Sequence, residues 1–223
     1  MKVFIVNYNR LELPKKLAEW VAERGCEPIF IDNHSDYAPL LSYYVSCRYR
    51  VLRMKENFGS RVVWEQKVLN WFSITDEYIV TDSDLDLSCV PDDFVKVLKE
   101  GLRKYPQFFK CGLSLEIKNL PATELAVQVR ELEQHYWDFP LDDMYFKADV
   151  DTTFAMYSRR TYDGTEEFLS GTRTNHPYTA KHVPWYYDNV ENLSEDEQYY
   201  FKTADKSKTY WGNHISNKLN IGQ

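Results

Sequence analysis

Three acidic residues are spaced two apart in the segment Asp82-Ser83-Asp84-Leu85-Asp86. The apolar run 78–80 comes directly before them and has the composition of a buried strand. Side chains alternate along an extended strand, so the three carboxylates would project from one side if the strand continued. Carboxylates at that spacing repel one another unless a cation lies between them, and Mg²⁺ and Mn²⁺ are cations that take oxygen ligands. The spacing therefore predicts a divalent metal site.

The acidic segment is also compatible with three alternatives. In a calcium-binding loop the three acids would take positions 1, 3 and 5, but Leu87 stands where glycine is required and Pro91 interrupts the remainder. Residues 84–88 resemble the nucleophile motif of haloacid-dehalogenase-like phosphatases, although that motif usually ends the first strand and here it ends the fourth. A solvated acidic turn before a helix accounts for the segment less well, because Asp92 and Asp93 already supply negative charge there.

Short apolar runs and amphipathic segments alternate through the first 117 residues. We expect strands near 3–6, 29–31, 51–52, 78–80 and 108–117, and helices near 13–21, 40–45, 62–72 and 91–105. This alternation predicts an α/β fold in which a mostly parallel sheet is covered by helices on both faces.

Polar loops follow the carboxyl ends of four of these predicted strands. They span residues 7–10, 32–35, 57–61 and 82–86. Ligands of parallel α/β sheets bind outside the carboxyl ends of the strands. We therefore expect the four loops to converge on one rim and to form a binding cleft there.

The second half of the chain is less regular. Residues 121–137 have a helical pattern, residues 152–157 resemble a strand, and residues 160–190 contain the glycines and prolines of a long loop region. Ser194, with Glu197 three residues later, is typical of a capping box that opens a helix to about Thr203. No linker composition separates the halves, so we expect one domain over 1–223.

Composition excludes several classes of partner and location. The formal net charge of −7 argues against a duplex nucleic acid as partner. No stretch approaches the roughly 20 apolar residues of a membrane span, and the N-terminal run is too short for a secretory signal. The four cysteines form no CxxC pair, and we interpret them as reduced, mostly buried thiols. A soluble, cytoplasmic protein is expected.

The segments VFIVNYNR, IDNHS, KENFG and YIVTDSDLDL, in that order, resemble the nucleotide-binding half of GT-A glycosyltransferases, in particular those of family 2 and their relatives. The similarity is good over about residues 3–88. The later segments ADVDTTFAMYSRR and HVPWYYDN are more loosely similar to small bacterial and viral members. This resemblance implies a GT-A-type, Rossmann-like sheet with an irregular C-terminal acceptor and lid region. It implies a nucleotide-binding half at 1–117 and an acceptor-binding and lid half at 118–223.

The resemblance also implies roles for residues of the four loops. Asp82 and Asp84 would be the Asp-x-Asp pair that holds Mn²⁺ or Mg²⁺ on a nucleotide diphosphate, with Asp84 the more direct ligand. The second loop departs from the family pattern, since it carries Asp-Asn-His-Ser in place of the more usual acidic-Gly-Ser. The residues expected to line the nucleotide cleft are Asn7, Asn9, Arg10, Asp32, Asn33, Asn57, Arg61 and Asp82.

An inverting transferase needs a carboxylate that deprotonates the acceptor hydroxyl. Asp151, just before the predicted strand in the second half, is the preferred candidate, and Asp149 is its neighbour and rival. Glu195, Asp196 and Glu197 resemble a second Glu-Asp motif, but a capped helix start accounts for them.

The C-terminal half offers further ligands. His182 is the preferred third metal ligand, ahead of His176 and His214, and Arg173 and Lys181 are expected to meet the pyrophosphate. The aromatic residues expected to form an acceptor wall are Trp137, Trp185 and Tyr186.

Together these features predict a metal-dependent glycosyltransferase that moves a sugar from a nucleotide-diphosphate donor, most readily a UDP-sugar, to a glycan or related acceptor with inversion. A Mg²⁺-dependent phosphatase and a non-catalytic sugar- or calcium-binding module are the alternatives. A sugar nucleotidyltransferase is disfavoured because residues 7–10 lack the glycines of its first loop.

Overall fold

The computed structural model describes residues 1–158, 168–205, 207, 209 and 215. Its strands are β1 (Lys2–Asn7), β2 (Glu27–Asp32), β3 (Arg50–Arg53), β4 (Tyr78–Asp82), β5 (Leu85–Asp86), β6 (Lys110–Gly112), β7 (Ser114–Leu115), β8 (Tyr145–Asp149), β9 (Ala155–Tyr157), β10 (Ser170–Thr174) and β11 (Thr179–His182). Its α-helices are α1 (Glu12–Glu23), α2 (Ala38–Ser46), α3 (Val62–Glu65), α4 (Val68–Trp71), α5 (Phe94–Lys104), α6 (Glu124–Gln134) and α7 (Glu195–Thr203). Short 3-10 helices are η1 (His135–Trp137), η3 (Val183–Tyr186) and η4 (Val190–Asn192).

The described strands build a large sheet in the order β3-β2-β1-β4-β9-β6-β10-β8. β1 pairs in parallel with β2 and β4, and β2 pairs in parallel with β3. β9 is antiparallel to β4 and β6, and β10 is parallel to β6 and antiparallel to β8. In this sheet β8 and β9 therefore run opposite to the other six described strands. The predicted α/β class with a mostly parallel sheet is confirmed.

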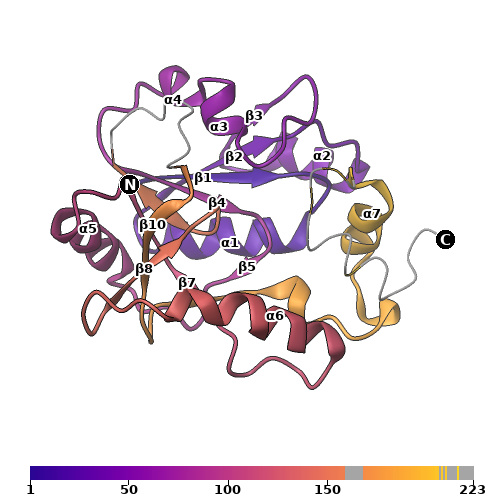
Figure 1. Cartoon of the computed structure of the whole chain (residues 1–223). Coiled ribbons are helices and arrows are strands. Elements are labelled where there is room, and N and C mark those ends of the chain that lie inside the picture. The colour runs from indigo at the N-terminus through magenta and orange to yellow at the C-terminus, as the bar shows by residue number, and fades with distance from the viewer. Residues whose placement is uncertain (159–167, 206, 208, 210–214, 216–223) are drawn as a thin grey trace.

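Helices cover both faces of the sheet because the strand residues alternate between two cores. In β1, Val3 and Ile5 pack into the core that contains the apolar sides of α1, α5 and α6. The residues between and after them, Phe4 and Val6, pack into a second core with α3 and α4. Figure 1 shows these two sets of helices on opposite sides of β1.

A second, smaller sheet has the order β5-β11-β7. β11 is antiparallel to β5, with His182 opposite Leu85, and is parallel to β7. This pairing brings a segment from the second half of the chain beside the acidic residues that follow β4. Two strands, β10 and β11, thus lie within the range 160–190 that was expected to be loop, so that expectation was wrong for its described part.

Two other expected elements are divided. The helix expected over 62–72 is split into α3 and α4, because Lys67 between them has a left-handed backbone (φ 55°). The strand expected over 108–117 ends at Gly112, and after Leu113 the chain continues as β7 in the smaller sheet. At Lys67 no glycine or proline marks the change of direction, whereas the second break falls at Gly112.

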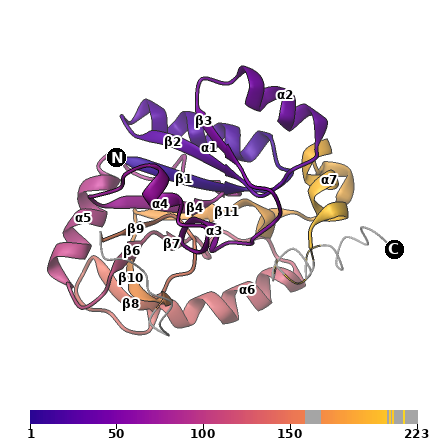
Figure 2. The same ribbon diagram turned by 90° about the horizontal axis from the view of Figure 1, so that it is seen from above.

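The C-terminal helix α7 packs beside the loops that follow β1 and β2 (Figures 1 and 2). The Tyr8 hydroxyl donates to the carbonyl oxygen of Thr203, and the rings of Tyr37 and Tyr199 lie 4.9 Å apart. Residues almost 200 positions apart in the sequence therefore form one edge of the molecule.

Among the described helices none is long and apolar enough to cross a membrane. The four cysteines are free thiols, of which Cys26 and Cys111 are buried and Cys89 is exposed.

Candidate active site

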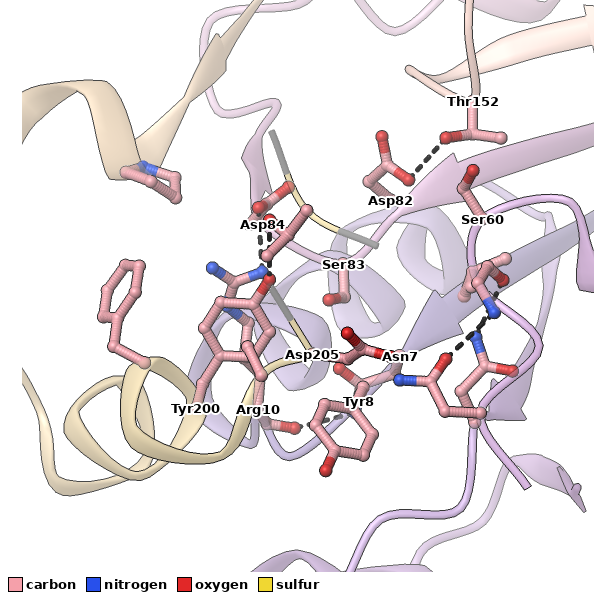
Figure 3. A pocket seen from close by; sticks show the side chains of 18 of the residues that line it. Asn7, Tyr8, Arg10, Ser60, Asp82, Ser83, Asp84, Thr152, Tyr200 and Asp205 are labelled. Carbon is pink, nitrogen blue, oxygen red and sulfur yellow. Dashed lines mark hydrogen bonds and ion pairs between the residues drawn. The ribbon is translucent and has the colours of Figure 1, made fainter. Parts of the chain in front are cut away.

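A cleft opens at the carboxyl ends of β1, β2 and β4. It is walled on one side by the loops after these strands and on the other by the segment before β9, the end of β11 and α7 (Figure 3). Its lining residues are Val6, Asn7, Tyr8, Arg10, Asn33, Asn57, Gly59, Ser60, Asp82, Ser83, Asp84, Asp151, Thr152, His182, Pro184, Tyr200, Phe201, Ala204, Asp205, Thr209 and Ile215. All four loops that the sequence analysis expected at one rim contribute to this lining.

The two acids of the Asp-x-Asp pair face different partners within the cleft. Oδ1 of Asp82 accepts a hydrogen bond from the Thr152 hydroxyl at 2.6 Å. Oδ2 of Asp84 accepts one from Arg10 Nη1 at 2.9 Å. Figure 3 shows the two carboxylates diverging from Ser83. The expectation that all three acids project together was wrong, because the extended chain breaks after Asp82.

Asp86, the third acid of the segment, lies outside the cleft lining. It is the last residue of β5, and its Oδ1 accepts a hydrogen bond from the Ser88 main-chain N–H at 2.8 Å. Its carboxylate therefore serves the turn after β5.

Arg10 is a buried cation shared between two elements. Its Nε donates to Glu197 Oε1 at 2.6 Å, and its Nη1 donates to Asp84 Oδ2 at 2.9 Å. The guanidinium also lies over the Tyr200 ring, 3.5 Å from the centroid. Burial opposes the charge of Arg10, but Glu197 and the other anionic neighbours outweigh it and hold its pKa well above the ordinary value. The side chain thus links the loop after β1 to α7 and to the acidic segment.

The capping box expected at Ser194 and Glu197 does not form as predicted. Ser194 makes no side-chain cap to a main-chain N–H, and Glu197 is turned toward Arg10. Asp196, which is 2% exposed, instead accepts hydrogen bonds from the main-chain N–H groups of Leu11 (2.7 Å) and Glu12 (2.9 Å). Leu11 has no side chain that could cap α1, so α7 supplies the missing acceptor from a distance. Asp196 and Glu197 are not among the residues that line the cleft.

His182 reaches the cleft from the end of β11. Its Nε2 is 3.4 Å from Asp84 Oδ2, and its ring packs against Trp185 with centroids 4.6 Å apart. The Val183 main-chain N–H donates to the carbonyl oxygen of Asp84 at 3.0 Å, which fixes the two segments together. The proposed third metal ligand therefore lies directly beside the Asp-x-Asp pair.

The charges of the cleft shift the two acids in opposite directions. Burial raises the pKa of Asp82, and the nearby Asp84 and Asp151 raise it further. Burial also acts to raise the pKa of Asp84, but the His182 and Arg10 side chains outweigh it and lower that pKa. Asp84 is thus held ionised, while the charge of Asp82 is opposed by two neighbouring carboxylates.

The donor set of the cleft suits a hard cation that a ligand helps to hold. Oδ1 of Asp84 is buried and has no hydrogen-bond partner among the described residues. Within the same residues no group of three or more histidine, cysteine or acidic side chains is arranged to hold a metal by itself. Mg²⁺ is usually bound through one or two carboxylates together with substrate phosphates. Asp82 and Asp84 therefore fit a cation that arrives with a diphosphate.

Asp151 presents an exposed carboxylate at the cleft. Its segment is tied to the acidic segment, because the main-chain N–H of Asp82 donates to the carbonyl oxygen of Thr152 at 3.1 Å. The neighbouring Asp149 lies in β8 and is not among the lining residues. The structure thus places Asp151, and not its rival, at the cleft.

Of the eight residues predicted for the nucleotide cleft, five line it, namely Arg10 and Asp82, described above, and three asparagines. Asn7 donates from Nδ2 to the Tyr44 hydroxyl at 2.9 Å, and Asn33 donates to the Gly59 carbonyl oxygen at 2.9 Å. Asn57 accepts at Oδ1 from the main-chain N–H of Gly59 at 2.9 Å. The Asn33 contact joins the loop after β2 to the loop after β3, the Asn7 contact reaches α2, and the Asn57 contact lies within its own loop.

Three other predicted positions need correction. Asn9 has a left-handed backbone (φ 52°) that turns its side chain into the protein, where its amide binds Asp36 and Thr203. Asp32 is fully buried and accepts from Arg53 Nε at 3.0 Å. Arg61 stacks on the Phe168 ring, 4.6 Å from its centroid. None of the three is among the lining residues.

The other C-terminal candidates that the structure describes are not among the lining residues. Arg173 is buried and pairs with Glu133 at 2.9 Å, and His176 stacks on Trp137 with ring centroids 5.2 Å apart. Lys181 is opposite Asp86 in the smaller sheet. Trp185 is buried under His182, Tyr186 donates to Asn119 at 2.6 Å, and His214 lies outside the described residues.

Neither a protein-family model nor a curated protein matches the sequence. Among solved structures, the chain is similar to the crystal structure of glucosyl-3-phosphoglycerate synthase from Mycobacterium tuberculosis in complex with phosphoglyceric acid, with 14% sequence identity and a TM-score of 0.45. The matched region covers 71% of this chain and 56% of that chain, so this chain spans little more than half the length of the matched protein.

Proposed function

We propose that this chain is a metal-dependent glycosyltransferase. In this proposal it moves a sugar from a nucleotide-diphosphate donor, with a UDP-sugar as the first candidate, to a saccharide acceptor with inversion at the sugar carbon. The observation that carries the proposal is the cleft itself, because Asp82, Asp84, Asp151 and His182 meet there beside the loops after β1, β2 and β3.

The position and the polarity of the cleft support a nucleotide ligand. It lies at the carboxyl ends of parallel strands, where α/β sheets bind nucleotides. Asn7, Asn33 and Asn57 give one wall amide groups that suit a base or ribose. The carboxylates line the same cleft, where a phosphate-bound cation would meet them. The arrangement agrees with the resemblance in the sequence, which names the same loops.

The chemistry assigned to each residue follows from its place. Mn²⁺ or Mg²⁺ held by Asp82 and Asp84, with His182 as a further ligand, would neutralise the charge that develops on the departing diphosphate. Arg10 keeps Asp84 ionised and oriented toward the cleft. Asp151, the exposed carboxylate, would take the proton of the acceptor hydroxyl as the acceptor attacks the sugar carbon.

Asp151→Asn is expected to lower turnover at least about a hundredfold, because general-base catalysis contributes roughly a hundred- to ten-thousandfold. Binding of the donor nucleotide should stay at the wild-type level, since Asn occupies the same volume and the Asp82–Asp84 pair is intact. The measurement is release of nucleoside diphosphate from a panel of sugar nucleotides with mixed saccharide acceptors, beside nucleotide binding by calorimetry.

Asp149→Asn is the matched control for this experiment. It makes the same chemical change two residues earlier, outside the cleft lining, and should leave turnover near the wild-type level. Wild-type turnover in Asp151→Asn would remove Asp151 as the base. Release of phosphate from a simple aryl phosphate, with no turnover of any sugar nucleotide, would favour the phosphatase alternative.

A further inference from the structure

Lys110, the first residue of β6, is a fully buried lysine. Among the described residues it forms no ion pair within 4 Å. Its Nζ lies near three rings, at 4.1 Å from the centroid of Phe168, 5.4 Å from that of Tyr157 and 5.5 Å from that of Phe109. Burying an ammonium group without a carboxylate partner is costly, even when ring faces compensate in part. Among the described residues, therefore, no ion-paired carboxylate offsets the cost of burying this lysine.

The ammonium group of Lys110 contacts the segment that carries Asp151. Nζ lies 3.4 Å from the carbonyl oxygen of Asp151, and the Tyr157 hydroxyl donates to the same oxygen at 3.0 Å. Two residues earlier, Arg173 Nε donates to the carbonyl oxygen of Asp149 at 2.8 Å. Three side chains from the protein interior thus hold the main chain of residues 149–151.

The other end of this segment is fixed to the acidic segment of the cleft. Thr152 donates its hydroxyl to Asp82, and its carbonyl oxygen accepts from the Asp82 main-chain N–H. Asp151 therefore lies between an interior anchor at Lys110 and a cleft anchor at Asp82. Its own carboxylate is exposed, so its direction depends on how the main chain beneath it is held.

We propose that Lys110 is a positioning residue, whose ammonium group holds the main chain of Asp151 from behind and so aims the Asp151 carboxylate into the cleft. The role of Asp151 as a base comes from the proposed function. The contact between Lys110 and the Asp151 main chain stands independently of it.

The charges around Lys110 support this role. Burial lowers the pKa of Lys110 to about 7, against the pull of Asp151, which acts to raise it. Arg61 and Arg173 also lower it, and Asp149 acts in the same direction as Asp151. The pKa of the phenol of Tyr157, which shares the carbonyl oxygen, is raised well above its ordinary value by burial, so it remains a donor. The charge of Lys110 should therefore change near neutral pH.

A depressed pKa in the folded state has a definite effect on stability. Lys110 binds its proton more weakly in the folded protein than in the unfolded chain, which lowers the free energy of unfolding. This loss is fully present below about pH 7 and disappears as the pH rises toward the ordinary lysine pKa of about 10.4. When a side chain lowers stability but is needed by an active site, replacing it is expected to raise stability and to lower activity.

Lys110→Met tests both consequences in the full-length chain. The methionine has a similar length and no charge, so we expect the melting temperature at pH 6–7 to rise by at least about 2 °C. This gain should shrink as the pH is raised toward 10. Lys147→Met, at an exposed lysine on β8, makes the same change and should leave the melting temperature near the wild-type value. A lower melting temperature for Lys110→Met, or failure of that variant to fold, would overturn the proposal.

Positioning is measured on Asp151 itself, without any substrate. Aspartate carboxylates labelled with carbon-13 give NMR signals, and Asp151→Asn identifies the signal of Asp151. In Lys110→Met this signal should move or broaden at pH 7. Tyr157→Phe, which removes the other donor and keeps the ring, should produce a smaller change. A signal with the wild-type position and width in Lys110→Met would contradict positioning.

Turnover completes the test and separates the two proposals. With a sugar nucleotide that the wild type turns over, Lys110→Met should lose at least about tenfold in turnover. It should keep wild-type binding of UDP with Mn²⁺. If Asp151→Asn retains full turnover, the proposed base fails, while the NMR result still decides the role of Lys110. If Asp151→Asn is inactive and Lys110→Met is fully active, the positioning role is wrong and the proposed function is unaffected.

Discussion

Replacing Asp84 by asparagine is expected to reduce turnover of a sugar nucleotide at least about a hundredfold and to leave the protein folded. The amide has the shape of the carboxylate but no charge for a divalent cation. Arg10 keeps its ion pair with Glu197, so the buried guanidinium still has a carboxylate partner. Turnover is measured as nucleoside diphosphate release in the presence of Mn²⁺, and folding is measured by circular dichroism and urea unfolding.

Asp86→Asn is the matched control for Asp84→Asn. It makes the same substitution in the same acidic segment, two residues along the chain, at a side chain that serves the turn after β5. Turnover close to wild type is expected for Asp86→Asn. Equal losses in the two variants would mean that the segment as a whole, and not the carboxylate in the cleft, matters. Wild-type turnover in Asp84→Asn would remove Asp84 from the metal site.

Arg10→Met is expected to lower the free energy of unfolding by about 3–5 kcal/mol, which is the usual result of removing one partner from a buried ion pair. Asp84 and Glu197 would remain buried without their shared cation, and the contact of the guanidinium with the Tyr200 ring would also be lost. The loss is measured by urea unfolding at pH 7, monitored by the fluorescence of the tryptophans.

Arg24→Met offers a control with the same kinds of contact at the surface. Arg24 pairs with Asp92 at 2.8 Å and lies 3.9 Å from the centroid of the Trp20 ring, but the side chain of Asp92 is 82% exposed. Exposed pairs contribute only about 0–1 kcal/mol, so Arg24→Met should have a small effect. A loss for Arg10→Met that is no larger than that for Arg24→Met would contradict the link between α7 and the cleft.

The local pattern of the sequence was sufficient to predict most of the sheet and its rim. Parallel strands joined by helices bring their carboxyl ends together whatever the details of packing, so Asn7, Arg10 and Asp84 could be assigned to one cleft from their places after strands. Asp151 reaches the cleft lining for a different reason, namely its position before a strand that pairs with β4.

The direction of individual side chains could not be predicted in the same way. Asn9 lies in the same predicted loop as Asn7, but its left-handed backbone turns it away from the cleft. Asp84 and Asp86 would lie on the same side as Asp82 only if the strand continued, but β4 ends at Asp82. The backbone angle of a single residue decides such cases, and for a residue other than glycine the sequence carries little signal of it.

Contacts between distant parts of the chain were also beyond the sequence pattern. Glu197 has the spacing of a helix cap, which is a sufficient local explanation, and its partner Arg10 is 187 residues away. Lys110 begins a strand, where a charged residue is ordinarily exposed, and only the packing of Phe109, Tyr157 and Phe168 around it shows that it is buried. The burial of such a charged residue can be recognised only from the residues that surround it in the three-dimensional structure.

The most direct test of the central claim is the melting temperature of the wild-type chain with a panel of nucleoside diphosphates, each with and without Mn²⁺. A ligand at about a hundred times its dissociation constant stabilises by about 2.7 kcal/mol, which raises the melting temperature of a chain of this size by roughly 5–10 °C. We predict such a rise for one nucleotide, UDP first, only with Mn²⁺, and its loss in Asp84→Asn. The absence of a rise with any nucleotide at saturating concentration, or an equal rise in Asp84→Asn, would contradict the nucleotide-metal site.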